Sequence, residues 1–169
     1  PIFSEERLAH RLKLGLVFDG GRLFNALTVA ENIALPLRYH GNLTPMAAEP
    51  QLGALLELLE LTPFAGTRAS SIGRNWQRRV ALARALILQP EVLLLDNPLA
   101  GLDLRQRHWW LSFLGELSRG HRLYGGRPIT IVVTAGGLRD WQGHAHQFAL
   151  LDGRHFSVLG DWAGVERSD

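Results

Sequence analysis

Apolar positions recur with two different spacings along the chain, and each spacing predicts one type of element. Apolar residues three or four positions apart predict helices that follow Thr28 and that cover residues 52–61, 75–88 and about 104–117. Short apolar runs predict strands over residues 12–18, 91–95 and 129–133, and two further runs flank the hairpin dipeptide Asp152-Gly153. Because strands alternate with helical crossovers, the pattern predicts an α/β fold with a parallel sheet.

Cap and turn residues set the expected limits of the first elements. Thr28 is suited to a helix N-cap, and Glu31 three positions later completes the sequence of a capping box. Pro36 is expected to end or kink that helix. Residues 41–50 are expected to form a loop, in which Thr44 offers a second cap. The segment that follows the first strand is therefore predicted to be a helix and then a loop.

The most hydrophobic strand ends in a carboxylate. The stretch VLLLDNPLAGLD, residues 92–103, changes abruptly from aliphatic residues to Asp96, Asn97 and Pro98. An uninterrupted aliphatic run predicts a strand that is buried on both faces, as in parallel sheets. Ligands of such sheets bind beyond the carboxyl ends of the strands, where Asp96 would face a ligand or a metal ion. The alternative is that Asp96 caps the following turn, in which Pro98 supplies its fixed φ.

Composition restricts the classes of protein to consider. The 169 residues are 46% hydrophobic and 20% charged, enough to bury a core, and residues 1–169 are taken as a single domain. The net charge is only +2, and the 18 basic residues, all arginine except Lys13, are scattered, so no nucleic-acid partner is expected. The absence of cysteine excludes disulfides and thiolate zinc sites. No long apolar run and no signal-peptide pattern occurs, so membrane insertion and secretion are not expected.

Several parts of the sequence together resemble the ATPase subunit of an ABC transporter. They are VF at residues 17–18, the segments 23–37 and 77–103, and the closing hairpin around Asp152-Gly153. The resemblance extends from Lys13 to about Gly160, and it implies a P-loop NTPase-like parallel sheet core with a helical subdomain. It places the helical subdomain at about residues 29–75, and the Walker B and D-loop core with the closing hairpin at residues 76–160.

The resemblance assigns family motifs to three aspartates. Asp96 corresponds to the Walker B aspartate, which holds the magnesium ion of the nucleotide. Asp103 ends the D-loop, through which the two cassettes of a dimer contact each other. Asp19 stands at the position of the Q-loop glutamine. The resemblance thus implies ATP and Mg²⁺ as cofactors, with Asp96 as the metal ligand if nucleotide binds.

The signature motif of the family is degenerate in this sequence. It falls on residues 72–76, and none of these residues matches the family sequence LSGGQ. Gly73, Arg74 and Asn75 occupy the positions whose serine and glycines let backbone amides grip the γ-phosphate of the opposite subunit's nucleotide. The side chains at positions 74 and 75 are expected to obstruct the close backbone approach that glycine permits.

Other parts of the catalytic apparatus are missing or altered. The sequence contains no G-x-x-x-x-G-K-[ST] phosphate cradle, so the fold is expected to be incomplete at its N-terminal side. Asn97 stands at the position of the general-base glutamate, and an amide cannot accept a proton there. Ala135 stands at the switch histidine and offers a phosphate no hydrogen bond. Because phosphoryl transfer needs these groups together, the chain alone is not expected to hydrolyse ATP.

Three functions stay open. The first is a degenerate, non-hydrolytic cassette subunit of an importer or lipid transporter, peripheral on the cytoplasmic face of the membrane, with a transmembrane permease and a homo- or heterodimer of cassettes as partners. Segment 23–37 would dock on that permease, although it can equally pack in the core. The second is a scaffold or interaction protein that uses the fold without nucleotide. The third is a fragment of a longer ATP-binding cassette protein with its own phosphate cradle. A neighbouring permease gene would favour the first function over the second.

Some conspicuous residues have simpler structural interpretations. His144 and His146 form an H-x-H pair, which by itself supplies too few ligands for a metal site. Trp109-Trp110 is expected to pack in the core and at its edge rather than to bind a ligand. Arg78 and Arg79 are expected on the solvated face of their helix. None of these residues favours one of the three functions over another.

Overall fold

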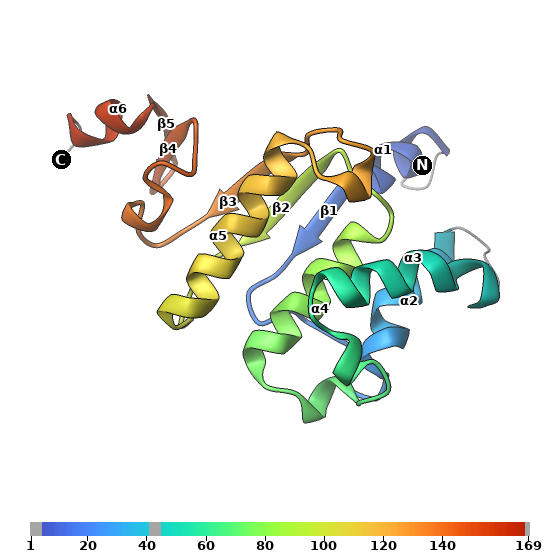
Figure 1. Ribbon diagram of the computed structural model, residues 1–169. Coiled ribbons are helices and arrows are strands. Elements are labelled where there is room, and N and C mark those ends of the chain that lie inside the picture. Colours follow the sequence, from blue (N-terminus) through green and yellow to red (C-terminus); the bar gives the residue numbers. More distant parts are fainter. Residues whose placement is uncertain (1–4, 41–44, 168–169) are drawn as a thin grey trace.

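The computed structural model describes residues 5–40 and 45–167, which form helices around a small sheet (Figure 1). The helices are α1 (Glu5–Leu12), α2 (Val29–His40), α3 (Pro45–Leu58), α4 (Arg74–Leu86), α5 (Leu104–Arg119) and α6 (Trp162–Glu166). The strands are β1 (Leu14–Val17), β2 (Val92–Asp96), β3 (Thr130–Thr134), β4 (Phe148–Asp152) and β5 (His155–Gly160). Short 3₁₀ turns are η1 (Thr62–Phe64), η2 (Ala69–Ser71), η3 (Arg122–Tyr124) and η4 (Arg139–Trp141).

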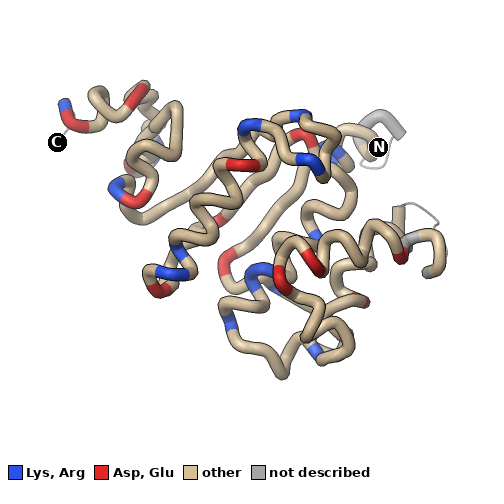
Figure 2. The backbone as a smooth tube through the Cα atoms, viewed as in Figure 1, with Lys and Arg blue, Asp and Glu red and all other residues tan. Residues whose placement is uncertain are grey.

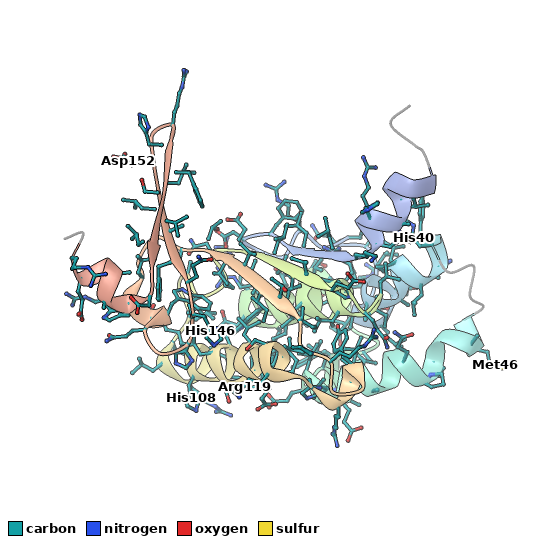
Figure 3. The ribbon with its side chains drawn as sticks, turned by 90° about the horizontal axis from the view of Figure 1, so that it is seen from above. His40, Met46, His108, Arg119, His146 and Asp152 are labelled. Atoms are coloured by element: carbon teal, nitrogen blue, oxygen red, sulfur yellow. The ribbon has the colours of Figure 1, made fainter. Side chains whose placement is uncertain are left out.

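The first three strands form a parallel sheet in the order β1-β2-β3. At its centre Leu16 of β1, Leu94 of β2 and Val132 of β3 lie in one row across the strands. Strands β4 and β5 form a separate antiparallel hairpin, in which Asp152 pairs with His155 across the turn. This hairpin projects from the body of the molecule, with Asp152 near its tip (Figure 3). The parallel sheet and the closing hairpin confirm the α/β prediction.

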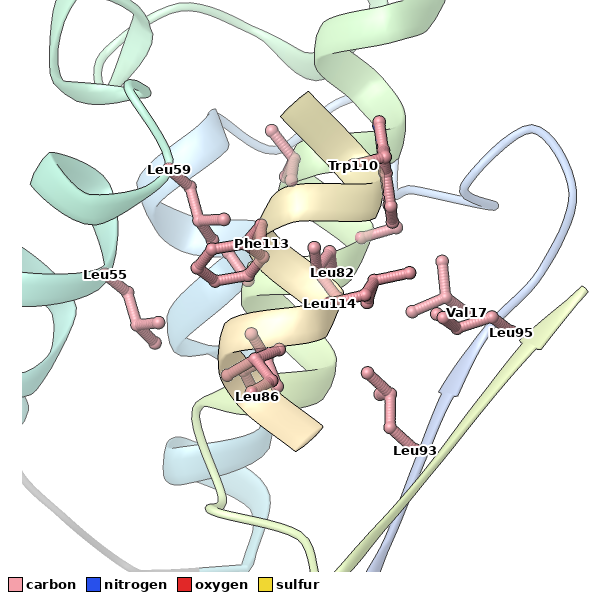
Figure 4. Close-up of a cluster of buried hydrophobic side chains, with 14 of the residues drawn as sticks. Val17, Leu55, Leu59, Leu82, Leu86, Leu93, Leu95, Trp110, Phe113 and Leu114 are labelled. Atoms are coloured by element: carbon pink, nitrogen blue, oxygen red, sulfur yellow. The ribbon is translucent and has the colours of Figure 1, made fainter. Parts of the chain in front are cut away.

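The two faces of the parallel sheet have different surroundings. Helices α4 and α5 lie against one face, where Leu93 and Leu95 of β2 are 0% and 2% exposed (Figures 3 and 4). On the opposite face Leu16 of β1 and Val132 of β3 are 45% and 51% exposed. Residues 91–95 were predicted to be buried on both faces, and this prediction is wrong for the described chain, because helices cover only one face.

The hydrophobic core fills the space between the covered face and the helices. Leu82 and Leu86 of α4, Leu114 and Trp110 of α5, and Leu93 of β2 belong to one buried cluster (Figure 4). Trp110 is fully buried, which confirms that the Trp109-Trp110 pair serves packing. Full burial of one such side chain is worth about 1.5–3 kcal/mol. The layer between sheet and helices is therefore the main source of stability.

The start of α2 confirms the predicted capping box. The Thr28 N–H donates to Glu31 Oε2 at 2.8 Å, and the Glu31 N–H donates to Thr28 Oγ1 at 3.2 Å. The Thr28 N–H, together with the Thr28 hydroxyl, which donates to the same Oε2 at 3.0 Å, lowers the pKa of Glu31 below its usual value of 4.5. The buried side chain of Asn32 holds the preceding loop, since it accepts from the Phe24 N–H at 2.9 Å and donates to the Phe24 carbonyl at 3.0 Å. Pro36 lies inside α2, which continues past it rather than ending there.

Helix α3 begins earlier than the sequence predicts. It starts at Pro45, whereas residues 41–50 were expected to form a loop and residues 52–61 a helix. Proline is well suited to the first helical position, because the N–H that it lacks would have no partner there. Pro50 also lies inside the helix. Thr44, the expected cap, lies outside the described residues.

Arg78 and Arg79 do not lie on a solvated face, so this prediction is wrong. The Arg79 side chain is only 3% exposed, and it lies between two indole rings at 3.6 Å from the Trp109 centroid and 4.8 Å from the Trp76 centroid. It also donates to Glu60 Oε2 at 2.6 Å. The Arg78 side chain is 11% exposed. Both guanidinium groups are buried because neighbouring segments supply partners for their charge.

The predicted division into parts is reflected in the order of elements but stays a prediction. Residues 29–75 contain α2, α3, η1 and η2, and residues 76–160 contain β2, β3, α5 and the hairpin. Positive and negative residues are scattered along the backbone in the part of the chain that Figure 2 colours. Across residues 5–40 and 45–167, no helix has the length and apolar character needed to cross a membrane.

Candidate functional site

Asp96 ends β2 at the carboxyl edge of the sheet, with Thr134 as its neighbour at the end of β3. The Thr134 hydroxyl donates to Asp96 Oδ1 at 2.8 Å, and the aspartate is exposed. Asp96 thus bonds across the sheet rather than capping the turn that follows it. No hydrogen bond from the described residues reaches Asp96 Oδ2. Sequence reasoning found Asp96 but missed Thr134, although both residues end apolar runs on neighbouring strands.

Asn97 is held by its backbone. Its φ of +47° lies in the left-handed region, which asparagine tolerates better than most residues. Its N–H lies 3.0 Å from the Thr134 carbonyl oxygen and 3.2 Å from Thr134 Oγ1. The chain therefore turns away from the sheet at Asn97, and an amide stands directly after the Asp96 carboxylate. This turn gives the asparagine a conformational reason to be there, apart from any chemistry.

The loop after β2 leads directly into α5. The Ala100 N–H donates to the Asn97 carbonyl at 3.2 Å, and the Leu102 N–H donates to the Leu99 carbonyl at 3.3 Å. Asp103 is the N-cap of α5, since its Oδ1 accepts from the Gln106 N–H at 2.8 Å. The Asp103 side chain thus has a structural partner within its own helix.

A cavity of about 820 Å³ opens beside this loop and the loop after β3. Asn97 and Ala135 both line it, so the positions of the general base and of the switch histidine face one space. Arg107 also lines it and forms an ion pair with Asp140 at 3.2 Å. The Arg107 Nε donates to the Leu102 carbonyl at 3.1 Å, which attaches the loop after β2 to the wall of the cavity. Sequence reasoning missed this arginine, because its ionic partner Asp140 lies 33 residues away along the chain.

The residues assigned from the sequence to the signature motif lie at the start of α4. Gly73 is the N-cap in an extended conformation, and no side chain caps the helix there. Arg74 is exposed and Asn75 is half-buried in the first turn. Trp76, at the end of the motif, packs against Phe64 with ring centroids 4.9 Å apart. Among the described interactions, none joins Gly73, Arg74 or Asn75 to Asp96. The structure therefore leaves this motif apart from the carboxyl edge of β2.

Asp19, at the Q-loop position, lies in the turn after β1. It forms an ion pair with Arg78 of α4, with Nη2 and Oδ1 separated by 3.0 Å. Sequence reasoning assigned Asp19 to the Q-loop position and Arg78 to solvent, so it missed the pair. The structure thus brings Asp96, Asn97 and Ala135 to one edge of the sheet, and it connects Asp19 to that region through α4.

Residues 1–100 match the model of a protein family described as ABC transporter. The chain belongs to the ABC transporter family. The matched range includes Asp19, residues 72–76 and Asp96, the positions assigned from the sequence to the Q-loop, signature and Walker B motifs, and it ends before Asp103 and Ala135. The expectation drawn from the sequence motifs is thereby confirmed at the level of the family.

The curated relatives within the ABC transporter family are named as ATP-binding proteins. A spermidine/putrescine import ATP-binding protein PotA of Roseobacter denitrificans is 42% identical over 116 residues, which cover 68% of this chain and 31% of the relative. A PotA of Trichodesmium erythraeum is 35% identical over 90% of this chain and 38% of its own length. Nod factor export ATP-binding protein I of Burkholderia pseudomallei is 33% identical over 90% of this chain and 47% of its own length. The chain thus spans about a third to about half of these relatives.

The carboxyl edge of β2 fits a magnesium ion carried by a nucleotide. Asp96 is exposed and offers Oδ2, while Thr134 holds Oδ1 in place. Mg²⁺ retains several waters and needs only one or two protein carboxylates when phosphates supply further ligands. A metal site made of protein alone is a different matter, since the described residues contain no group of three or more His, Cys, Asp or Glu side chains placed to hold one. His144 and His146 are thus not part of such a group among the described residues.

Proposed function

We propose that this chain acts as an ATP-binding cassette subunit that does not hydrolyse ATP by itself. The observation that carries the proposal is Asn97, an amide that directly follows Asp96 and is fixed by its φ of +47° and its N–H bond to Thr134. A general base must accept a proton within hydrogen-bond reach of the attacking water. An amide has no such capacity at neutral pH.

The surroundings of Asn97 support the same conclusion. Ala135 lines the cavity beside Asn97 but offers no hydrogen bond to a phosphate. Four charged residues line this cavity: Arg107, Arg139, Asp140 and Glu166. Arg107 forms an ion pair with Asp140 at 3.2 Å, and Glu166 Oε1 accepts from the Trp162 Nε1–H at 2.8 Å. Catalysis of phosphoryl transfer depends on groups that orient water and neutralise charge together. The two positions assigned to the general base and to the switch histidine therefore supply neither a proton acceptor nor a hydrogen bond to a phosphate.

In this proposal Asp96 holds the magnesium ion of a bound nucleotide, and Thr134 fixes the carboxylate toward it. A bound Mg²⁺ would supply neutralisation of the phosphate charge. Asp19, Gly73, Arg74, Asn75 and Asp103 are the further positions that we assign to nucleotide contact or to the contact between cassettes. The open N-terminus of α4, which begins after Gly73, would present backbone N–H groups to a phosphate.

The proposed partners are a transmembrane permease and a second cassette, at the cytoplasmic face of a membrane. Support comes from the names of the relatives, which are import and export ATP-binding proteins. A non-hydrolytic cassette would contribute its surface to a dimer whose other cassette performs the chemistry. Residues 1–169 are proposed to act as one cassette-like unit, with a helical part at about 29–75 and the core at 76–160.

Restoring the carboxylate tests the hydrolytic part of the proposal. In the protein at its native length, Asn97→Glu is expected to show no Mg²⁺-dependent phosphate release above the matched Asn97→Gln control, because Ala135 still lacks the hydrogen bond. Phosphate release from the glutamate variant alone would show that only the general base is missing, and it would overturn this account of the site.

A second experiment tests the nucleotide part. Binding of ATP in the presence and absence of Mg²⁺ is measured by calorimetry for the native protein and for Asp96→Ala. The expected result is that the substitution removes the Mg²⁺-dependent gain in affinity while Thr134→Val only weakens it. If Asp96→Ala leaves both affinities unchanged, the assigned role of Asp96 is wrong and a scaffold that works without nucleotide becomes the better account.

A further inference from the structure

Arg78 of α4 contacts two loops that leave the sheet from neighbouring strands. Its Nη2 atom lies 3.0 Å from Oδ1 of Asp19, in the turn after β1. Its Nη1 atom donates to the carbonyl oxygen of Ala100, in the loop after β2. We propose that Arg78 is a latch that couples the two loops, so that a change in one loop alters the mobility of the other.

The position of Arg78 suits it to this role. Its side chain is 11% exposed, whereas Asp19 is 52% exposed, so one end of the contact is anchored in the protein and the other faces water. The buried Nε of Arg78 has no hydrogen-bond partner among the described residues, so the terminal nitrogens carry the contacts to both loops. A guanidinium group is a rigid planar fork, and its two ends cannot be redirected independently. Displacement of either partner therefore displaces the group as a whole.

The turn after β1 lies directly on α4. Arg84 Nη2 donates to the carbonyl oxygens of Gly21 and Arg22, each at 3.0 Å. Gly21 has a φ of +79°, and a Cβ at this position would come within 3.0 Å of the Gln77 carbonyl oxygen. The turn is thus attached to α4 through its backbone as well as through Asp19. Motion of this turn is transmitted to the helix surface on which Arg78 lies.

The loop after β2 depends more strongly on Arg78. Its own backbone bonds are long, at 3.2 Å from the Ala100 N–H to Asn97 and 3.3 Å from the Leu102 N–H to Leu99. Hydrogen bonds near the upper end of the usual range of lengths resist opening weakly. A contact from a charged donor to the Ala100 carbonyl is stronger than either of them. Arg107 makes a second contact of this kind, from its Nε to the Leu102 carbonyl at 3.1 Å, so Arg78 is one of two charged side chains that restrain this loop.

The coupling goes beyond the proposed function, because it requires neither nucleotide nor partner. Its consequence is that the loop after β1 controls the loop that carries Asn97 and leads to Asp103. Any ligand or partner that attracts Asp19 would compete for Arg78 and loosen the loop after β2. The latch would thus convert binding at one loop into mobility at the other.

The test is amide hydrogen exchange of the protein at its native length, read by NMR at Ala100 and Leu102. Asp19→Asn removes the ionic partner in the first loop without touching the second. We expect the exchange rate of both amides to rise about two- to fivefold, which corresponds to the loss of an exposed ion pair. Arg78→Gln, which removes the latch itself, is expected to raise the exchange rate about tenfold, which corresponds to the loss of a hydrogen bond from a charged donor.

The decisive comparison is the double variant. In the Arg78→Gln background, Asp19→Asn should add nothing at Ala100 and Leu102, because the connection is already lost. Glu91→Gln is the matched control, since it breaks the exposed Lys13–Glu91 ion pair of 3.0 Å and should leave both amides unchanged. Unchanged exchange in Asp19→Asn alone would overturn the latch, even if Arg78→Gln proved too unstable to study. An equal effect of Asp19→Asn with and without Arg78 would overturn it as well.

Discussion

The layer between the sheet and helices α4 and α5 contrasts with the carboxyl edge of the same sheet. In the layer, Leu93, Leu82 and Trp110 are all fully buried, and their identity follows from the volume that they fill. At the edge, Asp96 and Asn97 are at least partly exposed, and their hydrogen bonds go to Thr134. Strand β2 thus runs from a region where burial decides which side chain fits to an edge where individual hydrogen bonds decide it.

The difference teaches that a family frame and its chemistry are separable. The layer depends on burial, so any sequence with the same apolar pattern preserves it. The edge depends on individual side chains, and here those side chains serve the backbone: Asn97 accommodates a left-handed turn and Asp103 caps α5. Under the proposed function, the frame of an ABC transporter subunit therefore persists without the groups needed for hydrolysis.

The largest expected effect concerns the layer itself. Leu93→Ala should lower the free energy of unfolding by about 2–5 kcal/mol, because it opens a cavity in a fully buried site. Leu16→Ala is the matched control on the neighbouring strand, where the side chain is 45% exposed on the other face, and it should cost below about 1 kcal/mol. Urea unfolding followed by circular dichroism measures both. Equal losses would mean that the second face is covered in solution.

At the edge, the first prediction concerns the conformation of Asn97. Asn97→Ala should lower the free energy of unfolding by about 1 kcal/mol, because alanine lacks the short polar side chain whose local hydrogen bonds let asparagine tolerate a φ of +47°. Asn97→Gly, which removes the strain, should stay within about 0.5 kcal/mol of the native protein in the same urea experiment. If alanine and glycine cost the same, the side chain of Asn97 rather than its backbone matters for stability.

A smaller effect is expected at the start of α5. Asp103→Ala should cost about 0.5–1 kcal/mol, because the Gln106 N–H loses its acceptor at 2.8 Å. Asp103→Ser retains a capping oxygen and should recover most of that loss. Thermal unfolding of the two variants measures the difference. A serine variant as unstable as the alanine variant would argue against the cap as the structural role of Asp103.

The smallest effect lies outside both regions, at the capping box of α2. The pKa of Glu31 is lowered in the folded state, chiefly by its hydrogen bonds from Thr28, so the folded protein binds fewer protons there than the unfolded chain. The stabilisation is present above the usual pKa of 4.5 and is lost as the pH falls through the lower folded value. The melting temperature of the native protein should exceed that of Glu31→Gln at pH 7, and this difference should be smaller at pH 3. A difference in melting temperature that is the same at pH 7 and pH 3 would contradict the prediction.

The sequence predicted those features that depend on neighbours along the chain. The apolar runs gave the parallel strands, and Thr28 with Glu31 marked the start of α2 correctly. Local signals also misled, because Pro45 begins a helix where proline suggested a loop, and Leu12 belongs to α1 rather than to the first strand. In both cases the local rule allows two outcomes, and the surrounding structure selects one.

The features that the sequence did not predict depend on distant partners. Arg79 was assigned to solvent, yet Glu60, Trp76 and Trp109 bury it from three different segments. At the candidate site, Asp96 was found because it follows an apolar run, whereas its partner Thr134 required knowledge of the strand register. Register and burial arise from the assembled sheet and helices, which no single stretch of sequence encodes.

The burial of Arg79 between two tryptophans also has an optical consequence. An indole ring that lies against a cation, as Trp109 does at 3.6 Å, differs electronically from an indole in water, and so does the fully buried ring of Trp110 next to it. Separation of α4 from α5 would expose both chromophores to solvent at once. The intrinsic fluorescence of the protein should therefore shift to longer wavelength when these two helices part, so the chain carries its own spectroscopic reporter at the centre of its fold.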